Sequence, residues 1–355
     1  MSFRYQILTL LFIPLWLSAN DSKWLDGVTP DGAPYVLLEP KTKSNNELVV
    51  WLPGYRPDGF TRAVDLNPND EAIAYLLKNG FSVASTSYRR NGLVVQDGMI
   101  DALQLIELLK AKNNYLKTWI IGISMGAEIT VNLSQEDTPL HSGAIVIGFP
   151  NIKKTVFEDI KASDKAFPKV PLLFLVNQSE SSHSEAYAET YKDHQPSPSI
   201  WIVRRDGHVN IRDVEIIRAF ESLKDSAPDS PPSGMDGTMI NLTPRSGADW
   251  VDQTTFECSV TQIDPVYGNV DLFCTMVDFA KMNLKKGDRF MLAYENRSVT
   301  VLLGNTFSDV EPGEWVAFPN ADGQLRLSRN FANAAKSLNL NINSRVRIQN
   351  ISASQ

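Results

Sequence analysis

The chain has 355 residues, of which 43% are hydrophobic and 21% are charged. This length is typical of two domains, and the composition is that of an ordinary globular protein rather than a disordered one. The formal net charge of -7 disfavours nucleic acid and anionic membrane surfaces as partners.

The first segment, residues 1–19, has the pattern of a signal peptide. Arg4 provides a positive charge, residues 7–17 form an apolar run, and small residues (Ser18 and Ala19) follow at the expected cleavage site. The run is too short to span a bilayer comfortably. We therefore expect an exported protein, periplasmic or secreted, without stable membrane insertion after cleavage. An uncleaved anchor is the alternative.

Residues 30–224 alternate apolar strands with amphipathic helices. The expected strands are residues 34–38, 47–52, 81–87, 119–121, 143–147, 171–176 and 199–203. The expected helices are residues 69–79, 97–112, 127–133, 151–162, 185–192 and 213–224. Such alternation predicts an α/β fold, a doubly wound and mostly parallel sheet covered by helices on both faces.

A G-x-S-x-G sequence separates the strand at 119–121 from the helix at 127–133, with Ser124 at its centre. Strand, G-x-S-x-G and helix together predict a nucleophile elbow, a tight turn that exposes a serine hydroxyl. The N–H of Met125 would then face an oxyanion. The loop after the strand at 47–52 is rich in Pro and Gly, so the N–H of Tyr55 is the second expected donor.

A nucleophilic serine needs a base and a carboxylate that orients the base. His208 follows the last expected strand of the sheet, at the edge where Ser124 also lies, and is the expected base. Glu180 follows the preceding strand and is the expected acid, with Glu185 as the alternative. Asp206 is too close to His208 in sequence to reach its ring easily.

The chain changes character after residues 225–236, a segment rich in Pro and Ser that we interpret as a linker. Residues 237–351 predict a smaller, mostly β, barrel-like domain with one helix at 330–338. Its expected strands include residues 255–263, 270–277, 288–296, 298–303 and 345–349. Cys258 and Cys274 lie opposite each other across a turn, so they either form a disulfide in an oxidising compartment or remain two buried free thiols.

Residues 34–224 resemble the α/β-hydrolase superfamily. The resemblance rests on Leu52-Pro53-Gly54-Tyr55, on Gly122-Ile123-Ser124-Met125-Gly126, on the loop at 176–182 and on Gly207-His208. It implies a Ser-His-acid triad of Ser124, His208 and Glu180 without a large lid. The family usually has Asp as the acid and His-Gly in the oxyanion loop, where this chain has Glu180 and Pro53-Gly54.

Residues 255–348 resemble the C-terminal β domain of S-adenosylmethionine hydrolases (hydroxide adenosyltransferases) and fluorinases. The matching stretches are residues 264–269, 305–309, 311–313, 320–323 and 328–330. The resemblance implies that Asp264, Asn269, Phe307, Arg329 and Asn330 contact an adenosine-like ligand. Ala321 replaces a serine of that family, and its N-terminal catalytic domain has no counterpart here.

The sequence therefore favours an exported serine hydrolase that cleaves a small carboxylic ester, or an amide, through an acyl-enzyme. No cofactor is expected, and no metal, because no His/Cys/Asp cluster has ligand spacing. The alternative is a binding protein whose β domain holds an adenosine-like ligand. Packing or homo-oligomerisation through the β domain is a third role, compatible with catalysis.

Overall fold

The computed structural model describes residues 22–41, 43–150, 167–225 and 245–351. The expected signal peptide at 1–19, the helix at 151–162 and nearly all of the linker at 225–236 lie outside these residues. None of the helices in the described ranges is both long and apolar enough to cross a membrane.

An eight-stranded sheet organises the N-terminal domain, in the order β1-β2-β4-β3-β5-β6-β7-β8. Only β1–β2 and β2–β4 pair antiparallel, and the remaining neighbours are parallel. The strands are β1 (Ser22–Val28), β2 (Pro34–Pro40), β3 (Glu47–Leu52), β4 (Ser82–Thr86), β5 (Lys117–Ile123), β6 (Gly143–Ile147), β7 (Leu172–Asn177) and β8 (Ser199–Val203). The prediction of a doubly wound, mostly parallel sheet is confirmed.

Helices cover both faces of this sheet because successive strand residues point to opposite sides. Ile120 packs with α2 and α3, whereas the next residue, Ile121, packs with α1 and α5. The helices are α1 (Glu71–Lys78), α2 (Val95–Lys112), α3 (Met125–Ser134), α4 (Ser181–Thr190) and α5 (Asp213–Asp225). Two apolar cores therefore sandwich the sheet.

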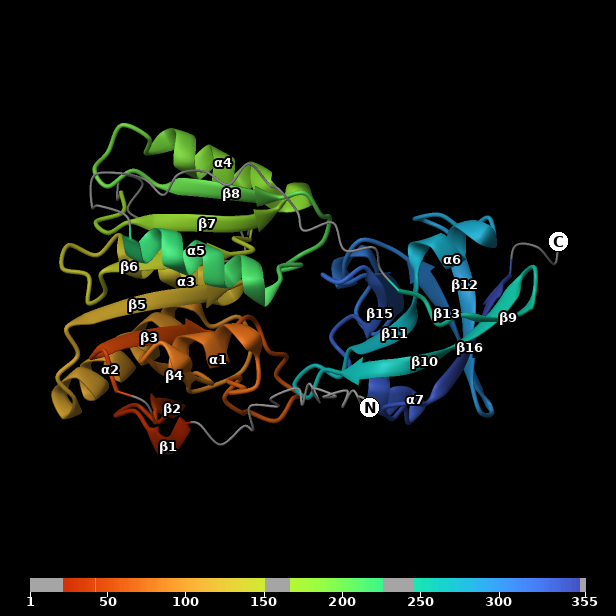
Figure 1. Cartoon of the computed structure of the whole chain (residues 1–355), viewed down its shortest axis with the longest axis horizontal. Helices are drawn as coiled ribbons and strands as arrows, with labels where there is room; N and C mark the ends of the chain where they lie inside the picture. Colours follow the sequence, from red (N-terminus) through yellow and green to blue (C-terminus); the bar gives the residue numbers. More distant parts are fainter. Residues whose placement is uncertain (1–21, 42, 151–166, 226–244, 352–355) are drawn as a thin grey trace, which may run out of the picture.

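The C-terminal domain is a closed barrel of seven strands in the order β11-β15-β14-β13-β12-β16-β10, closed by pairing of β10 with β11. Its elements are β9 (Asp249–Asp252), β10 (Thr255–Ile263), β11 (Val270–Thr275), α6 (Met276–Lys281), β12 (Arg289–Tyr294), β13 (Arg297–Leu303), β14 (Trp315–Pro319), β15 (Gln324–Arg329), α7 (Ala334–Leu338) and β16 (Arg345–Asn350). Figure 1 shows the barrel beside the ends toward which β7 and β8 point. The expectation of a smaller, barrel-like β domain is confirmed.

The two cysteines, for which the sequence leaves a disulfide and two free thiols open, are neighbours in the structure. Cys258 and Cys274 are both buried and unbridged. Burial raises the pKa of the Cys274 thiol, and its hydrogen bond with Cys258 raises it further. Two neighbouring neutral thiols thus pack inside the barrel, at the seam between β10 and β11.

Candidate active site

Ser124 occupies the turn between β5 and α3 in a strained conformation. Its backbone has φ 55° and ψ -114°, a region that non-glycine residues rarely adopt. The strained turn is held by the Ser124 N–H, which donates to the carbonyl oxygen of Ile147 at 2.9 Å. This geometry is that of a nucleophile elbow.

Three glycines let the chain approach itself closely around this turn. A Cβ on Gly122 would lie 2.0 Å from Oγ1 of Thr130, and one on Gly126 would lie 2.1 Å from the carbonyl oxygen of Leu52. A Cβ on Gly54 would lie 3.2 Å from Cβ of Ser124. The loop after β3 therefore passes directly beside the serine.

His208 connects Ser124 to Glu180 through two short hydrogen bonds. Ser124 Oγ lies 2.8 Å from His208 Nε2, and His208 Nδ1 lies 2.6 Å from Oε2 of Glu180. The side chains of His208 and Glu180 keep exposed fractions of 22% and 16%. A histidine so placed can accept a proton from the serine while the carboxylate fixes its orientation.

Glu180 also fixes the loop that carries the histidine. Its Oε1 accepts a hydrogen bond from the N–H of Val209 at 3.3 Å. Val209 has φ 56°, which is costly for a β-branched residue. Gly148 faces this arrangement, and a Cβ there would lie 2.6 Å from Cγ2 of Val209 and 3.3 Å from Cε1 of His208. Strain and close approach are thus concentrated around the imidazole.

The alternative acid and the other histidines lie elsewhere. Glu185 is exposed on α4. His183 stacks on Phe149, with ring centroids 4.6 Å apart, and is half-buried. His141 is buried and hydrogen-bonded to Ser134, and burial lowers its pKa to about 3. Of the four histidines, only His208 contacts Ser124.

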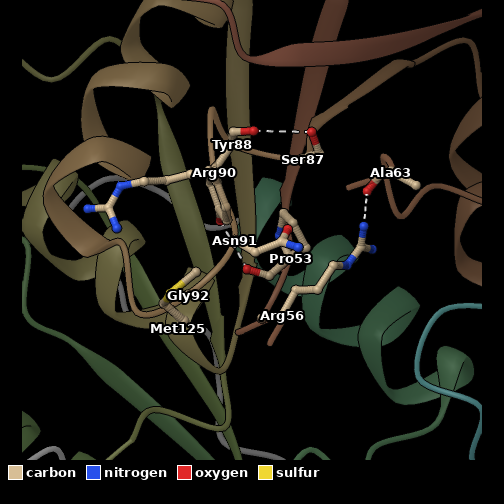
Figure 2. A pocket seen from close by; sticks show the side chains of 10 residues that line it. Pro53, Arg56, Ala63, Ser87, Tyr88, Arg90, Asn91, Gly92 and Met125 are labelled. Atoms are coloured by element: carbon tan, nitrogen blue, oxygen red, sulfur yellow. Dashed lines mark hydrogen bonds between the residues drawn. The ribbon is translucent and has the colours of Figure 1, made fainter. Parts of the chain in front are cut away.

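The loop that follows β3 is anchored from several sides. The Tyr88 hydroxyl donates to the carbonyl oxygen of Pro53 at 2.9 Å, and the guanidinium of Arg56 donates to the carbonyl oxygen of Ala63. Figure 2 shows these residues around a small cavity of about 10 Å³, with Met125 on its wall. The N–H of Met125 begins α3 and has no intrahelical acceptor. It is therefore available to an oxyanion beside Ser124.

A cavity of about 350 Å³ opens from Ser124 and His208 and continues between the two domains. Both predicted site groups line it: Ser124, His208 and Tyr55 from the hydrolase-like side, and Asp264, Asn269, Phe307, Arg329 and Asn330 from the barrel. Glu180 contacts Nδ1 of His208, and Met125 lines the smaller cavity together with Gly54. One cavity is thus lined both by residues predicted for hydrolysis and by residues expected to contact an adenosine-like ligand.

Two aromatic side chains of the barrel contact residues of the N-terminal domain in this cavity. The ring of Phe307 lies 6.0 Å from that of His208, and the ring of Phe331 lies 5.5 Å from that of Tyr55, both edge to face. Phe331 is 53% exposed and has φ 53°. An exposed, strained aromatic residue at a cavity is typical of a ligand-contacting position.

The charged groups of the cavity are largely fixed by the protein itself. Arg326 makes a bidentate pair with Asp271, with contacts of 2.7 and 2.9 Å. Burial raises the pKa of Asp65, and the nearby carboxylate of Asp264 raises it further. Additional negative charge is therefore unfavourable beside Asp65.

In the described ranges, no group of three His, Cys, Asp or Glu side chains could hold a metal ion.

Several residues that shape the site escaped the sequence analysis. Tyr88, Gly148 and Val209 contact it only after folding, and no local pattern marks them. Tyr267 belongs to a quoted motif, residues 264–269, yet its contact with Tyr55 crosses 212 positions. Phe331 follows another quoted stretch, residues 328–330, which was the one available signal.

Both domains of the chain are similar to known proteins. Residues 258–347 match the family model of the SAM hydroxide adenosyltransferase C-terminal domain. No curated protein matches the chain in sequence. An uncharacterized conserved protein from Thermotoga maritima is 20% identical, with a TM-score of 0.25 over 27% of this chain, and the chain covers 35% of that protein.

Two further solved structures cover more of the chain. An esterase from Pyrococcus furiosus is 16% identical, with a TM-score of 0.40 over 56% of this chain and 88% of its own. A lidless α/β serine hydrolase from Xanthomonas campestris is 14% identical, with a TM-score of 0.41 over 57% of this chain and 93% of its own. The elbow after β5 and the strand order of the parallel sheet describe an α/β-hydrolase-like N-terminal domain.

Proposed function

We propose that this chain, which joins an α/β-hydrolase-like domain to a barrel similar to the SAM hydroxide adenosyltransferase C-terminal domain, is a serine hydrolase. The observation that carries the proposal is the continuous contact from Ser124 Oγ through His208 to Glu180, at 2.8 and 2.6 Å. A strained elbow that opens into a cavity supports it.

In this mechanism Ser124 Oγ attacks the carbonyl carbon of the substrate while His208 Nε2 takes the hydroxyl proton. Glu180 stabilises the resulting imidazolium. The N–H groups of Tyr55 and Met125 donate to the tetrahedral oxyanion. His208 then gives its proton to the leaving group, which departs and leaves an acyl-enzyme. Water deprotonated by His208 attacks this ester, and the proton returns to Ser124 when the acid is released.

The cavity favours a small, uncharged acyl substrate. Aromatic side chains line both walls, and the carboxylates of Asp65 and Asp264 in the same cavity oppose an anionic group placed beside them. We propose an ester rather than an amide as the substrate, because an ester has the better leaving group. We also propose export through the segment at 1–19, which the N-terminal residue of the purified mature protein would test.

A second candidate is ligand binding by the barrel, with weak or no catalysis. It is favoured by one observation: the five barrel residues expected to contact an adenosine-like ligand line the cavity of Ser124. Adenosine binding that persists in Ser124→Ala, with no turnover of any ester or amide, would support this candidate over hydrolysis.

Labelling with a fluorophosphonate probe tests the hydrolase directly. The probe reacts only with a serine that has a working base and oxyanion hole. We expect wild-type protein to be labelled, and Ser124→Ala and His208→Ala to remain unlabelled. Ser134→Ala is the matched control, since it removes the other histidine-bonded serine. An unlabelled but folded wild-type protein would contradict the proposal.

A further inference from the structure

The barrel makes a direct hydrogen bond to the loop that would bind the oxyanion. The hydroxyl of Tyr267 donates to the carbonyl oxygen of Tyr55 at 3.1 Å. On the other side of Gly54, the hydroxyl of Tyr88 donates to the carbonyl oxygen of Pro53 at 2.9 Å. Two tyrosines, one from each domain, therefore bracket the peptide that carries the Tyr55 N–H.

The barrel presents Tyr267 in a fixed position. Asp264 Oδ1 accepts hydrogen bonds from the N–H groups of Val266 and Tyr267 at 2.7 and 2.8 Å. Burial raises the pKa of Tyr267 well above its ordinary value, and the charge of Asp65 raises it further. The hydroxyl is therefore protonated and able to donate at neutral pH.

The barrel holds the histidine loop as well. Asn210, two residues after His208, donates through Nδ2 to the carbonyl oxygen of Pro319 at 3.2 Å. Lys286 makes a 3.1 Å salt bridge with Asp206, two residues before it. The ring of Phe307 packs edge to face on the imidazole. Both loops that flank Ser124 are therefore in contact with the second domain.

We propose that the barrel completes the hydrolase site and that Tyr267 is a positioning residue, which aims the Tyr55 N–H at the oxyanion. This inference rests on the proposed function. Tyr267 touches neither the serine nor the histidine, so it acts through the loop. Loss of an oxyanion donor lowers kcat by about 10²–10³-fold. A loop that is only loosened should lose less, on the order of tenfold in kcat.

Tyr267→Phe in the full chain tests the proposal, because it removes the hydroxyl and keeps the ring. Tyr294→Phe is the matched control, a barrel tyrosine whose hydroxyl contacts Ser344 within its own domain. We expect Tyr267→Phe to lower kcat and the rate of fluorophosphonate labelling about tenfold, with KM within about twofold. The Tyr294→Phe variant should match wild-type protein.

Hydrogen exchange distinguishes failure of this proposal from failure of the hydrolase. The backbone amides of Gly54, Tyr55 and Arg56 should exchange faster in Tyr267→Phe than in wild-type protein, whether or not the protein turns over any substrate. Unchanged kcat, labelling and exchange would overturn the positioning role while leaving the hydrolase intact. If wild-type protein is not labelled, the hydrolase fails, and unchanged exchange would then reject Tyr267 as an anchor of the loop too.

Discussion

The described part of the N-terminal domain contains two serine–histidine hydrogen bonds of almost equal length. Ser124 and His208 are 2.8 Å apart, and Ser134 and His141 are 2.9 Å apart. The first histidine also contacts Glu180, whereas in the described ranges no acidic side chain lies within salt-bridge distance of His141. Ser134 and His141 are buried, and Ser124 faces a cavity.

The comparison shows that the hydrogen bond between serine and histidine is the least distinctive part of the site. Burial lowers the pKa of His141 to about 3, which makes it a poor acceptor for the proton of Ser134. Ser134 also donates its hydroxyl to the carbonyl oxygen of Thr130 at 2.7 Å. An orienting carboxylate, backbone strain and access to solvent separate a reactive serine from a structural one.

Removing the carboxylate of Glu180 should make Ser124 and His208 most similar to Ser134 and His141, which have no orienting carboxylate among the described residues. Glu180→Gln is expected to lower kcat by roughly 10³–10⁴-fold, because the histidine loses its orientation and the imidazolium its countercharge. Glu185→Gln, on the exposed face of α4, should change kcat less than twofold. Steady-state kinetics on a chromogenic ester would compare them, and the reverse order would identify Glu185 as the acid.

A methyl group beside the serine tests the importance of the oxyanion loop. Gly54→Ala places a Cβ 3.2 Å from that of Ser124, so the loop must shift, and we expect kcat to fall about 10²-fold. Gly59→Ala lies in the same loop with no atom within 4 Å of the added Cβ and should be neutral. Equal kcat values for the two variants would exclude a role of this loop in catalysis.

His141, the histidine of the second pair, should affect how the free energy of unfolding depends on pH in acid. The pKa of His141 is about 3 in the folded protein against 6.5 ordinarily, so its stabilising contribution is present above pH 6.5 and is lost as pH falls from 6.5 toward 3. The unfolding free energy should drop by about 2 kcal/mol between pH 7.5 and 5 from this group. Urea unfolding of His141→Gln should show a correspondingly smaller drop; an unchanged drop would assign acid sensitivity to other groups.

Ser124 and His208 open into a cavity, and residues of the barrel form one of its walls. Phe331→Gly removes an exposed ring from the cavity and relieves a left-handed backbone, so KM should rise about tenfold without a loss of melting temperature. Trp250→Ala removes a barrel aromatic that is 38% exposed and does not line the cavity, and KM should stay unchanged. A rise in KM in both variants would indicate general loosening of the barrel.

Much of this architecture could be predicted from local patterns. The bounds of β3, β6 and β8 agree with the sequence prediction because their runs are short, apolar and mostly buried. Strand β1 was not predicted, because its exposed edge position allows Asp26 and Gly27, and only pairing with β2 makes it a strand. Helix α6 was predicted as the end of a strand, although Thr275 and Asp278 form a capping box at its start.

Some residues of the candidate site could likewise be predicted from the sequence, and others could not. Ser124, His208 and Glu180 could be placed because each follows a recognisable strand, and parallel strands end at one edge of the sheet. The contacts of Gly148 with Val209 and of Tyr267 with Tyr55 could not, since they depend on how separate elements dock. The sequence also could not predict that barrel residues share one cavity with Ser124. That depends on the relative position of the two domains, and local periodicity carries no information about it.

The closure of the barrel by β10 and β11 has a consequence for how this protein could change over time. Every strand of the closed ladder has two neighbouring strands, so the ladder has no open edge that a loop must cover. Loops on such a scaffold tolerate substitution and changes of length. We therefore expect that the cavity wall carrying Phe307 and Phe331 can be replaced, in evolution or in the laboratory, to bind other ligands, provided that Tyr267 keeps its hydrogen bond to the other domain.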